Sequence, residues 1–248
     1  FRAKLVTELQ SQPEFGSDYK LAEPAIVFPQ GTIETRGGQD DTEVARAANI
    51  LVLGISDTFW NLDSLNAQPV ALNDGEVILN QALAADLNVK VGDLITLRLP
   101  KELQVNADSP LGSEESTDRV EGIPDLKVAA IIQNKGLGRF ALRPNQTTSR
   151  NAYVRLDLLQ DELDQDDQCN AILVSSKQGD NPPDEDASKR LRSWLKPTLS
   201  DLGLEINPVS IQYKPAGATE STVVLKYDTI LGYINQSPCK IFLSLIHI

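Results

Sequence analysis

The side chains able to do chemistry in this chain are mainly carboxylates, and they do not form the pattern of a reaction centre. The densest group is one acidic run: Asp157, Asp161, Glu162, Asp164, Asp166 and Asp167. Asp157 and Asp161 are four residues apart and share one face of an expected helix, but the run does not match a calcium-binding loop. A solvated helix end is favoured over a metal site. We therefore expect no bound metal.

Patterns for nucleophilic or phosphate chemistry are not met either. Neither the turn at residues 134–138 nor Gly37-Gly38 fits a phosphate-binding loop. There is no Gly-x-Ser-x-Gly elbow, and Cys169 precedes an expected buried strand without a histidine to activate it, which favours an inert core thiol. The chain is expected to be no enzyme and to bind no cofactor. A hydrolase using an unrecognised carboxylate pair, testable at Asp57 or Glu76, is the least favoured alternative.

One segment differs in kind, because two arginines flank an aromatic residue and Pro and Asn follow. It supplies the candidate partner-contact residues: Arg139, Phe140, Arg143, Asn145 and Gln146. In the structural interpretation, which we slightly prefer, Phe140 and Leu142 face inward while Arg139 and Arg143 face water. In the functional interpretation the segment is an exposed contact loop.

The clearest local pattern lies at residues 75–100. Residues 76–79 alternate as a strand, Asn80 is a good helix N-cap, and apolar residues then recur at helical spacing. Gly92-Asp93 supplies a turn, and residues 94–99 form a second strand that Pro100 ends. The pattern predicts a strand–helix–turn–strand module, which builds a surface and carries no reactive group.

Strands and helices alternate along the rest of the chain, which indicates an α/β or α+β fold. Helices are expected at residues 1–12, 156–163 and 187–202, the last kinked or shortened by Pro197. Strands are expected at 25–28, with residues 31–33 as an extension after a kink, and at 50–55, 126–132, 151–154, 170–175, 204–213 and 222–227. Phe59-Trp60 is expected to pack in the core. Residues 101–124 form a long acidic insertion.

The composition excludes some partners. The 248 residues carry a formal net charge of −12, which argues against binding nucleic acid or an anionic lipid surface. Cys169 and Cys239 are too few for a disulfide framework, and their spacing leaves their redox state open. No window approaches the roughly 18 to 20 apolar residues of a membrane span.

Both ends of the chain indicate a fragment. It begins at Phe1 and contains no methionine, so we expect an internal piece of a longer protein. Residues 243–248 (Leu-Ser-Leu-Ile-His-Ile) resemble a translated sequencing adaptor, and residues 235–240 fit no element. Residues 231–248 are treated as a doubtful tail, and with them His247, the sole histidine.

Several ordered motifs resemble one family. Residues 53–60 (Leu-Gly-Ile-Ser-Asp-Thr-Phe-Trp), 75–84 (Gly-Glu-Val-Ile-Leu-Asn-Gln-Ala-Leu-Ala) and 87–97 (Leu-Asn-Val-Lys-Val-Gly-Asp-Leu-Ile-Thr-Leu) are similar to the extracytoplasmic domain of MacB/FtsX-type ABC transporter permeases. Residues 138–146 and 170–174 resemble a branch of the same family. The similarity covers roughly residues 1–230, and the long acidic insertion at 101–124 departs from the best-known members.

The resemblance implies a coupling module of α+β class with two lobes. One lobe, of mixed α/β type, would combine residues 1–48 and 150–230, and the other, largely β, would be the insertion at 49–149. It also implies one membrane helix before the domain and three after it, a cytoplasmic ABC ATPase as partner, and a dimeric parent protein. The segment would lie on the periplasmic side of a bacterial inner membrane and relay motion to a periplasmic protein or lipoprotein substrate.

A second interpretation stays open. Residues 91–97 (Val-Gly-Asp-Leu-Ile-Thr-Leu) also resemble strand openings in small barrel folds. The alternative is therefore a stand-alone β-barrel-containing domain that binds peptides or assembles as a subunit.

Overall fold

The computed structural model describes residues 1–35, 44–63, 70–100, 120–142, 148–177, 183–198, 201, 204–213, 223–232 and 242–245. The strands are β1 (Tyr19–Thr35), β2 (Arg46–Ile55), β3 (Glu76–Asn80), β4 (Leu94–Pro100), β5 (Val120–Ile132), β6 (Asn151–Arg155), β7 (Ala171–Ser176), β8 (Leu204–Tyr213), β9 (Val223–Gly232) and β10 (Phe242–Leu245). The helices are α1 (Lys4–Gln10), α2 (Phe15–Asp18), η1 (Phe59–Leu62), α3 (Gln81–Leu87), η3 (Gly136–Arg139), α4 (Leu156–Glu162) and α5 (Glu185–Trp194). The predicted α+β class is confirmed.

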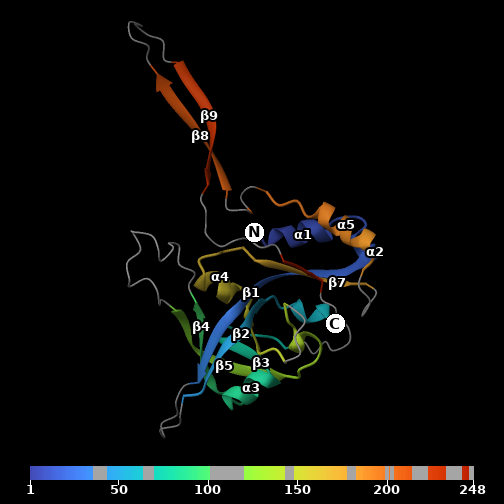
Figure 1. Ribbon diagram of the computed structural model, residues 1–248, viewed down its shortest axis with the longest axis vertical. Helices are drawn as coiled ribbons and strands as arrows, with labels where there is room; N and C mark the ends of the chain where they lie inside the picture. Colours follow the sequence, from blue (N-terminus) through green and yellow to red (C-terminus); the bar gives the residue numbers. More distant parts are fainter. Residues whose placement is uncertain are drawn as a thin grey trace.

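Six of the strands close into a barrel. The main sheet has the order β10-β7-β1-β2-β6-β3-β5-β4, and β4 also pairs with β1, which joins the ends of the ring. Two pairings, β2 with β6 and β3 with β5, are parallel, and the other four pairings of the ring are antiparallel. The barrel fills the lower half of Figure 1.

The barrel interior is packed with aliphatic side chains. The buried cluster includes Ile33, Ile50, Val52, Val77, Leu79, Ile95, Leu97, Val128, Ala152 and Val154. Leu83 of α3 and Leu159 of α4 belong to the same cluster. Side chains of this size are expected to fill a small barrel completely, so the barrel acts as a solid body.

Residues on the outer side of the barrel strands form a second cluster with η1. Phe59 and Trp60 are 0% and 6% exposed, and both rings contact Tyr153 of β6, with centroids 6.1 and 5.2 Å away. The predicted core packing of Phe59-Trp60 is confirmed. A third cluster is covered by α1, α2 and α5 over β7 and the start of β1, and it contains the buried Cys169, as predicted.

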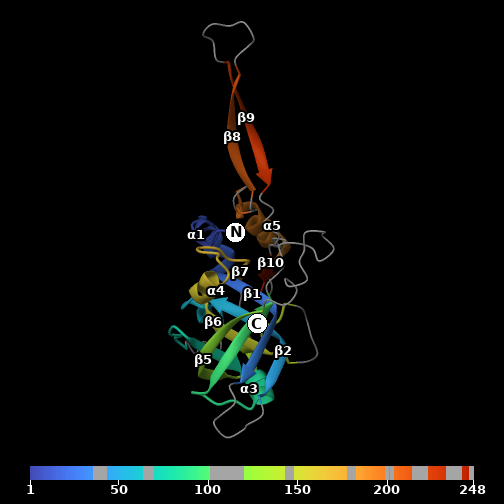
Figure 2. The same cartoon turned by 90° about the vertical axis from the view of Figure 1, so that its left-hand side faces the viewer.

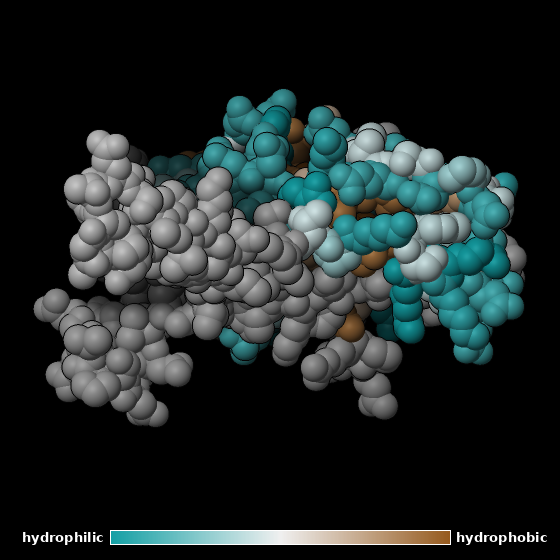
Figure 3. All heavy atoms as spheres, turned by 90° about the horizontal axis from the view of Figure 1, so that it is seen from above, coloured by the Kyte–Doolittle hydropathy of each residue, from teal (hydrophilic) through white to brown (hydrophobic). Residues whose placement is uncertain are grey.

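The antiparallel hairpin of β8 and β9 stands away from the rest of the molecule in both side views (Figures 1 and 2). Viewed from the hairpin end, the described side chains of the body are mostly hydrophilic, and hydrophobic ones show only between them (Figure 3). The body thus has a polar surface on this face.

The structure gives the full extent of three segments that the sequence outlined in part. The strand predicted at residues 25–28 does extend through residues 31–33 after an irregularity, a register shift between Phe28 and Gly31, and β1 also continues through Pro24 and Pro29 to span Tyr19–Thr35. The helix predicted at 187–202 is shortened ahead of Pro197, as expected: α5 ends at Trp194, and Leu195 is already extended. Within the tail that the sequence analysis set aside, residues 242–245 form β10, which pairs in parallel with β7, and residues 235–240 lie outside the described residues.

The barrel draws on both predicted lobes. β1 and β6 come from the segments assigned to the mixed lobe, β3, β4 and β5 come from residues 49–149, and β2 crosses that boundary. The division into lobes remains a prediction. Residues 101–119 of the acidic insertion lie outside the described residues, and its last residues, 120–124, belong to β5.

Candidate partner-contact site

The candidate contact segment, residues 138–146, begins within η3, whose first two residues lead into it from β5, and the structure describes it as far as residue 142. Leu137, Gly138 and Phe140 are buried, whereas Arg139 is exposed, so the inward position of Phe140 and the outward position of Arg139 are confirmed. With 5% exposure, Phe140 anchors the segment to the body. The candidate residues Arg143, Asn145 and Gln146 lie outside the described residues. A role of the segment in partner contact remains a prediction.

Three buried neutral side chains hold the main chain of this segment. The Tyr153 hydroxyl donates to the carbonyl oxygen of Leu137. Asn80 Nδ2 donates to the carbonyl oxygen of Gly138 at 3.1 Å, and Asn151 Nδ2 donates to that of Phe140 at 2.8 Å. Since buried carbonyl groups without partners are costly, this network fixes the path of the segment over the barrel.

Asn80 links the network to two further elements. Its Oδ1 accepts from the Leu83 backbone N at 3.1 Å, as the predicted N-cap of α3, and also from the Asn151 backbone N at 3.1 Å. Its Nδ2 donates to the carbonyl oxygen of Ser149 as well. The sequence revealed the cap alone, because the other partners of Asn80 are 58 to 71 residues away.

Burial keeps the network in its neutral form. It raises the pKa of the Tyr153 hydroxyl well above 10.0, although the hydrogen bond with Asn151 opposes the shift. The phenol therefore stays protonated and can donate to Leu137. Gly138 leaves no room for a side chain, because a Cβ at this position would lie 2.1 Å from the carbonyl oxygen of Gln133.

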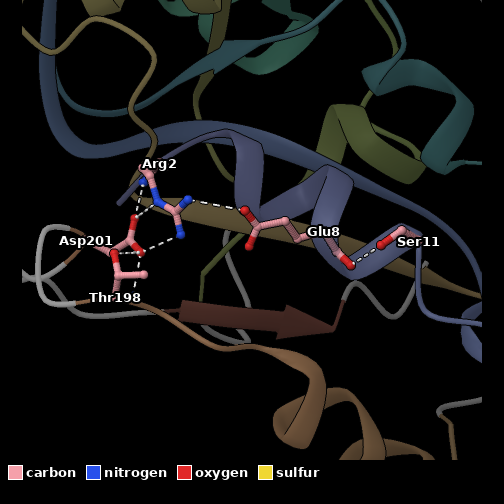
Figure 4. Close-up of polar contacts among 5 residues, drawn as sticks. All are labelled: Arg2, Glu8, Ser11, Thr198 and Asp201. Atoms are coloured by element: carbon pink, nitrogen blue, oxygen red, sulfur yellow. Dashed lines mark hydrogen bonds and ion pairs between the residues drawn. The ribbon is translucent and has the colours of Figure 1, made fainter.

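A second polar anchor, the Arg2–Asp201 clamp, joins the start of the described chain to the root of the hairpin (Figure 4). The carboxylate of Asp201 accepts from the Arg2 backbone N, from Arg2 Nε at 2.8 Å and from Arg2 Nη2 at 3.0 Å. It also accepts from the backbone N and hydroxyl of Thr198 at 2.7 and 2.8 Å. The two clamped residues are 199 positions apart.

The clamp is a buried charge stabilised by donors. The Asp201 side chain is fully buried, and Arg2 is 35% exposed. Burial acts to raise the pKa of Asp201, but the hydrogen bonds from Arg2 and Thr198 outweigh it and hold this pKa well below its ordinary value of 3.8. No local sequence signal marks Asp201, because its partner Arg2 is distant in the chain.

Two of the carboxylates considered for chemistry, Asp157 and Glu76, are held by structural hydrogen bonds. Asp157 is bound by the Arg155 guanidinium and by the Leu158 backbone N, which lower its pKa. Glu76 accepts from the backbone and side chain of Asn73, which lower its pKa, and Asp57 is exposed. Within the described ranges, no group of three or more His, Cys, Asp and Glu residues is arranged to hold a metal ion.

No protein-family model and no curated protein matches this chain. Among the residues that the structure describes, no helix has the length and apolar character to cross a membrane.

Proposed function

We propose that this chain is the extracytoplasmic domain of an ABC transporter permease of the MacB/FtsX type, a module that relays motion and has no reaction centre of its own. In this role it couples a cytoplasmic ATPase, through membrane helices outside this sequence, to a periplasmic protein or lipoprotein substrate. The resemblance at residues 53–60, 75–84 and 87–97 is the sequence support.

The observation that carries the proposal is the Arg2–Asp201 clamp. A relay must pass displacement of one chain segment to another without unfolding, and it can do so only where contacts between the segments are strong and specific. The clamp supplies such a contact between the segment leading into α1 and the root of the β8–β9 hairpin. The packed barrel, with Ile33, Ile50 and Leu79 all 0% exposed, supplies the solid body that moves with them.

The test begins with the complete reading frame. We expect about 20 consecutive apolar residues before Phe1 and three such spans after residue 230. Two reporters can be fused at Arg2 and Tyr213: alkaline phosphatase, which is active only in the periplasm, and a fluorescent protein that fluoresces only in the cytoplasm. The alkaline phosphatase fusions should be active, and the fluorescent protein fusions should not fluoresce. A reading frame without such spans, or a reporter active in the cytoplasm, overturns the proposal.

The relay itself is testable in the intact permease. Arg2→Ala should leave ATP hydrolysis by the cognate ATPase close to the wild-type rate while lowering substrate export. The reason is that the clamp, in this proposal, couples ATP hydrolysis to export. Lys189→Ala, which removes an exposed ion pair of α5 with Glu185, is the matched control and should export normally. Normal export by Arg2→Ala contradicts the relay.

The closed six-stranded barrel also suits the alternative, a stand-alone binding or assembly domain. The two proposals separate on the same reading frame, because the alternative requires no flanking membrane spans. In that case the purified chain should retain its partner without any membrane fraction.

A further inference from the structure

The charge of the chain is distributed unevenly around the contact segment. Residues 133–155 contain five basic residues and no acidic one, within a protein of net charge −12: Lys135, Arg139, Arg143, Arg150 and Arg155. Because the remainder of the chain is strongly acidic, this stretch is one of the places where its charge is locally reversed. We call residues 133–155 the basic segment.

The described basic side chains of this segment fall into two groups. Arg150 pairs with Asp86 through Nε and Oδ2 at 2.5 Å, and Arg155 pairs with Asp74 and Asp157. Lys135 and Arg139 are exposed, and neither forms an ion pair with a residue that the structure describes. Within the described part of the chain, Arg150 and Arg155 thus have acidic partners, whereas Lys135 and Arg139 are exposed without one.

The main chain that carries Arg139 is fixed before any partner arrives. Its neighbours Gly138 and Phe140 are buried, and their carbonyl oxygens are bound by Asn80 and Asn151. A main chain that is already ordered lowers the conformational-entropy cost of binding. Arg139 therefore projects from a rigid support, as is expected of an interface residue.

We infer that Lys135 and Arg139 form a docking surface for an acidic segment of a partner protein. Charge complementarity selects this partner: at about 0.1 M salt, charges more than about 10 Å away are largely screened. An acidic peptide then experiences the local cations more than the distant acidic surface. A nucleic acid or an anionic membrane is disfavoured, because each extends far beyond this patch and meets the negative charge around it.

This inference rests on the proposed function for its biological partner, but its test does not need the permease. The probe is a fluorescein-labelled deca-glutamate peptide, titrated with the full 248-residue chain at 0.1 M NaCl and followed by fluorescence anisotropy. Binding to the wild-type chain should be weakened about tenfold by K135E/R139E, as two reversed surface charge contacts imply. The binding should also weaken further as salt is raised.

The matched control is K4E/K90E. Lys4 and Lys90 are exposed and lie outside the basic segment, and this double variant has the same formal net charge as K135E/R139E. It should stay within about twofold of the wild-type affinity, because neither lysine belongs to the proposed docking surface. Unfolding in urea, followed by tryptophan fluorescence, checks that both variants fold.

Three results overturn the inference: no binding of the peptide to the wild-type chain, equal weakening by the two double variants, or weak peptide binding together with tight, Lys135- and Arg139-dependent binding to vesicles of phosphatidylcholine and phosphatidylserine. None of these results affects the membrane topology that the reporter fusions measure. Conversely, a reading frame without membrane spans removes the proposed function and leaves a measured docking surface intact.

Discussion

Two polar anchors hold irregular main-chain segments of this protein in place, one through neutral hydrogen-bonding groups and the other through an ion pair. The network of Asn80, Asn151 and Tyr153 uses neutral groups in the body to hold residues 136–140. The Arg2–Asp201 clamp uses an ion pair to hold the root of the hairpin. Of the donors in the neutral network only the Tyr153 hydroxyl can ionise, at high pH, whereas the clamp weakens when Asp201 takes up a proton at low pH. The two anchors should therefore respond to opposite ends of the pH scale.

Removing the centre of the neutral network should have the largest effect. Asn80→Ala deletes four hydrogen bonds of a side chain that is 0% exposed, and at about 1 kcal/mol each we expect a loss of about 4 kcal/mol in the free energy of unfolding. Urea unfolding measures it. Asn73→Ala, at an exposed asparagine that bonds only locally to Glu76, should cost less than about 1 kcal/mol.

Breaking the clamp should come next. Asp201→Ala leaves the Arg2 guanidinium and the Thr198 donors without their acceptor, and a loss of about 3 kcal/mol is expected, at the low end for buried pairs because Arg2 is partly exposed. Hydrogen exchange should rise in residues 195–201 and around Arg2. The control Asp86→Ala removes the exposed pair with Arg150 and should cost less than about 1 kcal/mol. Equal losses in the two variants would remove the distinction between a buried and an exposed pair.

The pH dependence of the clamp should be smaller than its full loss. The pKa of Asp201 is lowered from 3.8 in the folded protein, so its stabilisation is complete above about pH 4 and is lost as the pH falls below that value. Between pH 5 and 2, stability should therefore fall more steeply in the wild-type chain than in Asp201→Asn. Parallel curves would show that other carboxylates set the acid limit.

The mildest change tests the phenol of the network. Tyr153→Phe keeps the ring contacts with Phe59 and Trp60 and removes the hydroxyl, for an expected loss of about 1 kcal/mol at neutral pH. Because the folded pKa of Tyr153 is raised above 10.0, the wild-type chain should lose stability as the pH rises past 10. The variant should lose less over the same range, as measured by urea unfolding at pH 9 to 11.

Local patterns predicted those parts of the fold that depend on neighbours in the chain. The cap at Asn80 and the strand–helix–turn–strand module needed only residues within a few positions of one another. The extension of β1 to residues 31–33 was expected after a kink, but its continuation through Pro24 and Pro29 was not, because prolines indicate breaks. In the fold, β2 pairing begins only at Ala25, just after Pro24, and a register shift lies between Phe28 and Gly31.

The site was predicted in part. The types and spacing of Arg139 and Phe140 indicated which one faces water and which one packs. The support beneath them was not visible, since Asn80 and Tyr153 reach the contact segment from distant strands. Barrel closure through β1 and β4 and the clamp between Arg2 and Asp201 are likewise long-range contacts, which periodicity does not encode.

The short strand β10 has a consequence for chains of different length. It covers β7 in parallel register, from Phe242 opposite Ala171 to Leu245 opposite Val174, and it is the outermost strand of the main sheet. A chain trimmed before Phe242 would leave a row of unpaired amide and carbonyl groups along β7, and such an open border favours pairing with the same strand of another molecule. Trimming this end is therefore expected to promote concentration-dependent association of a protein whose strong negative charge otherwise keeps its copies apart.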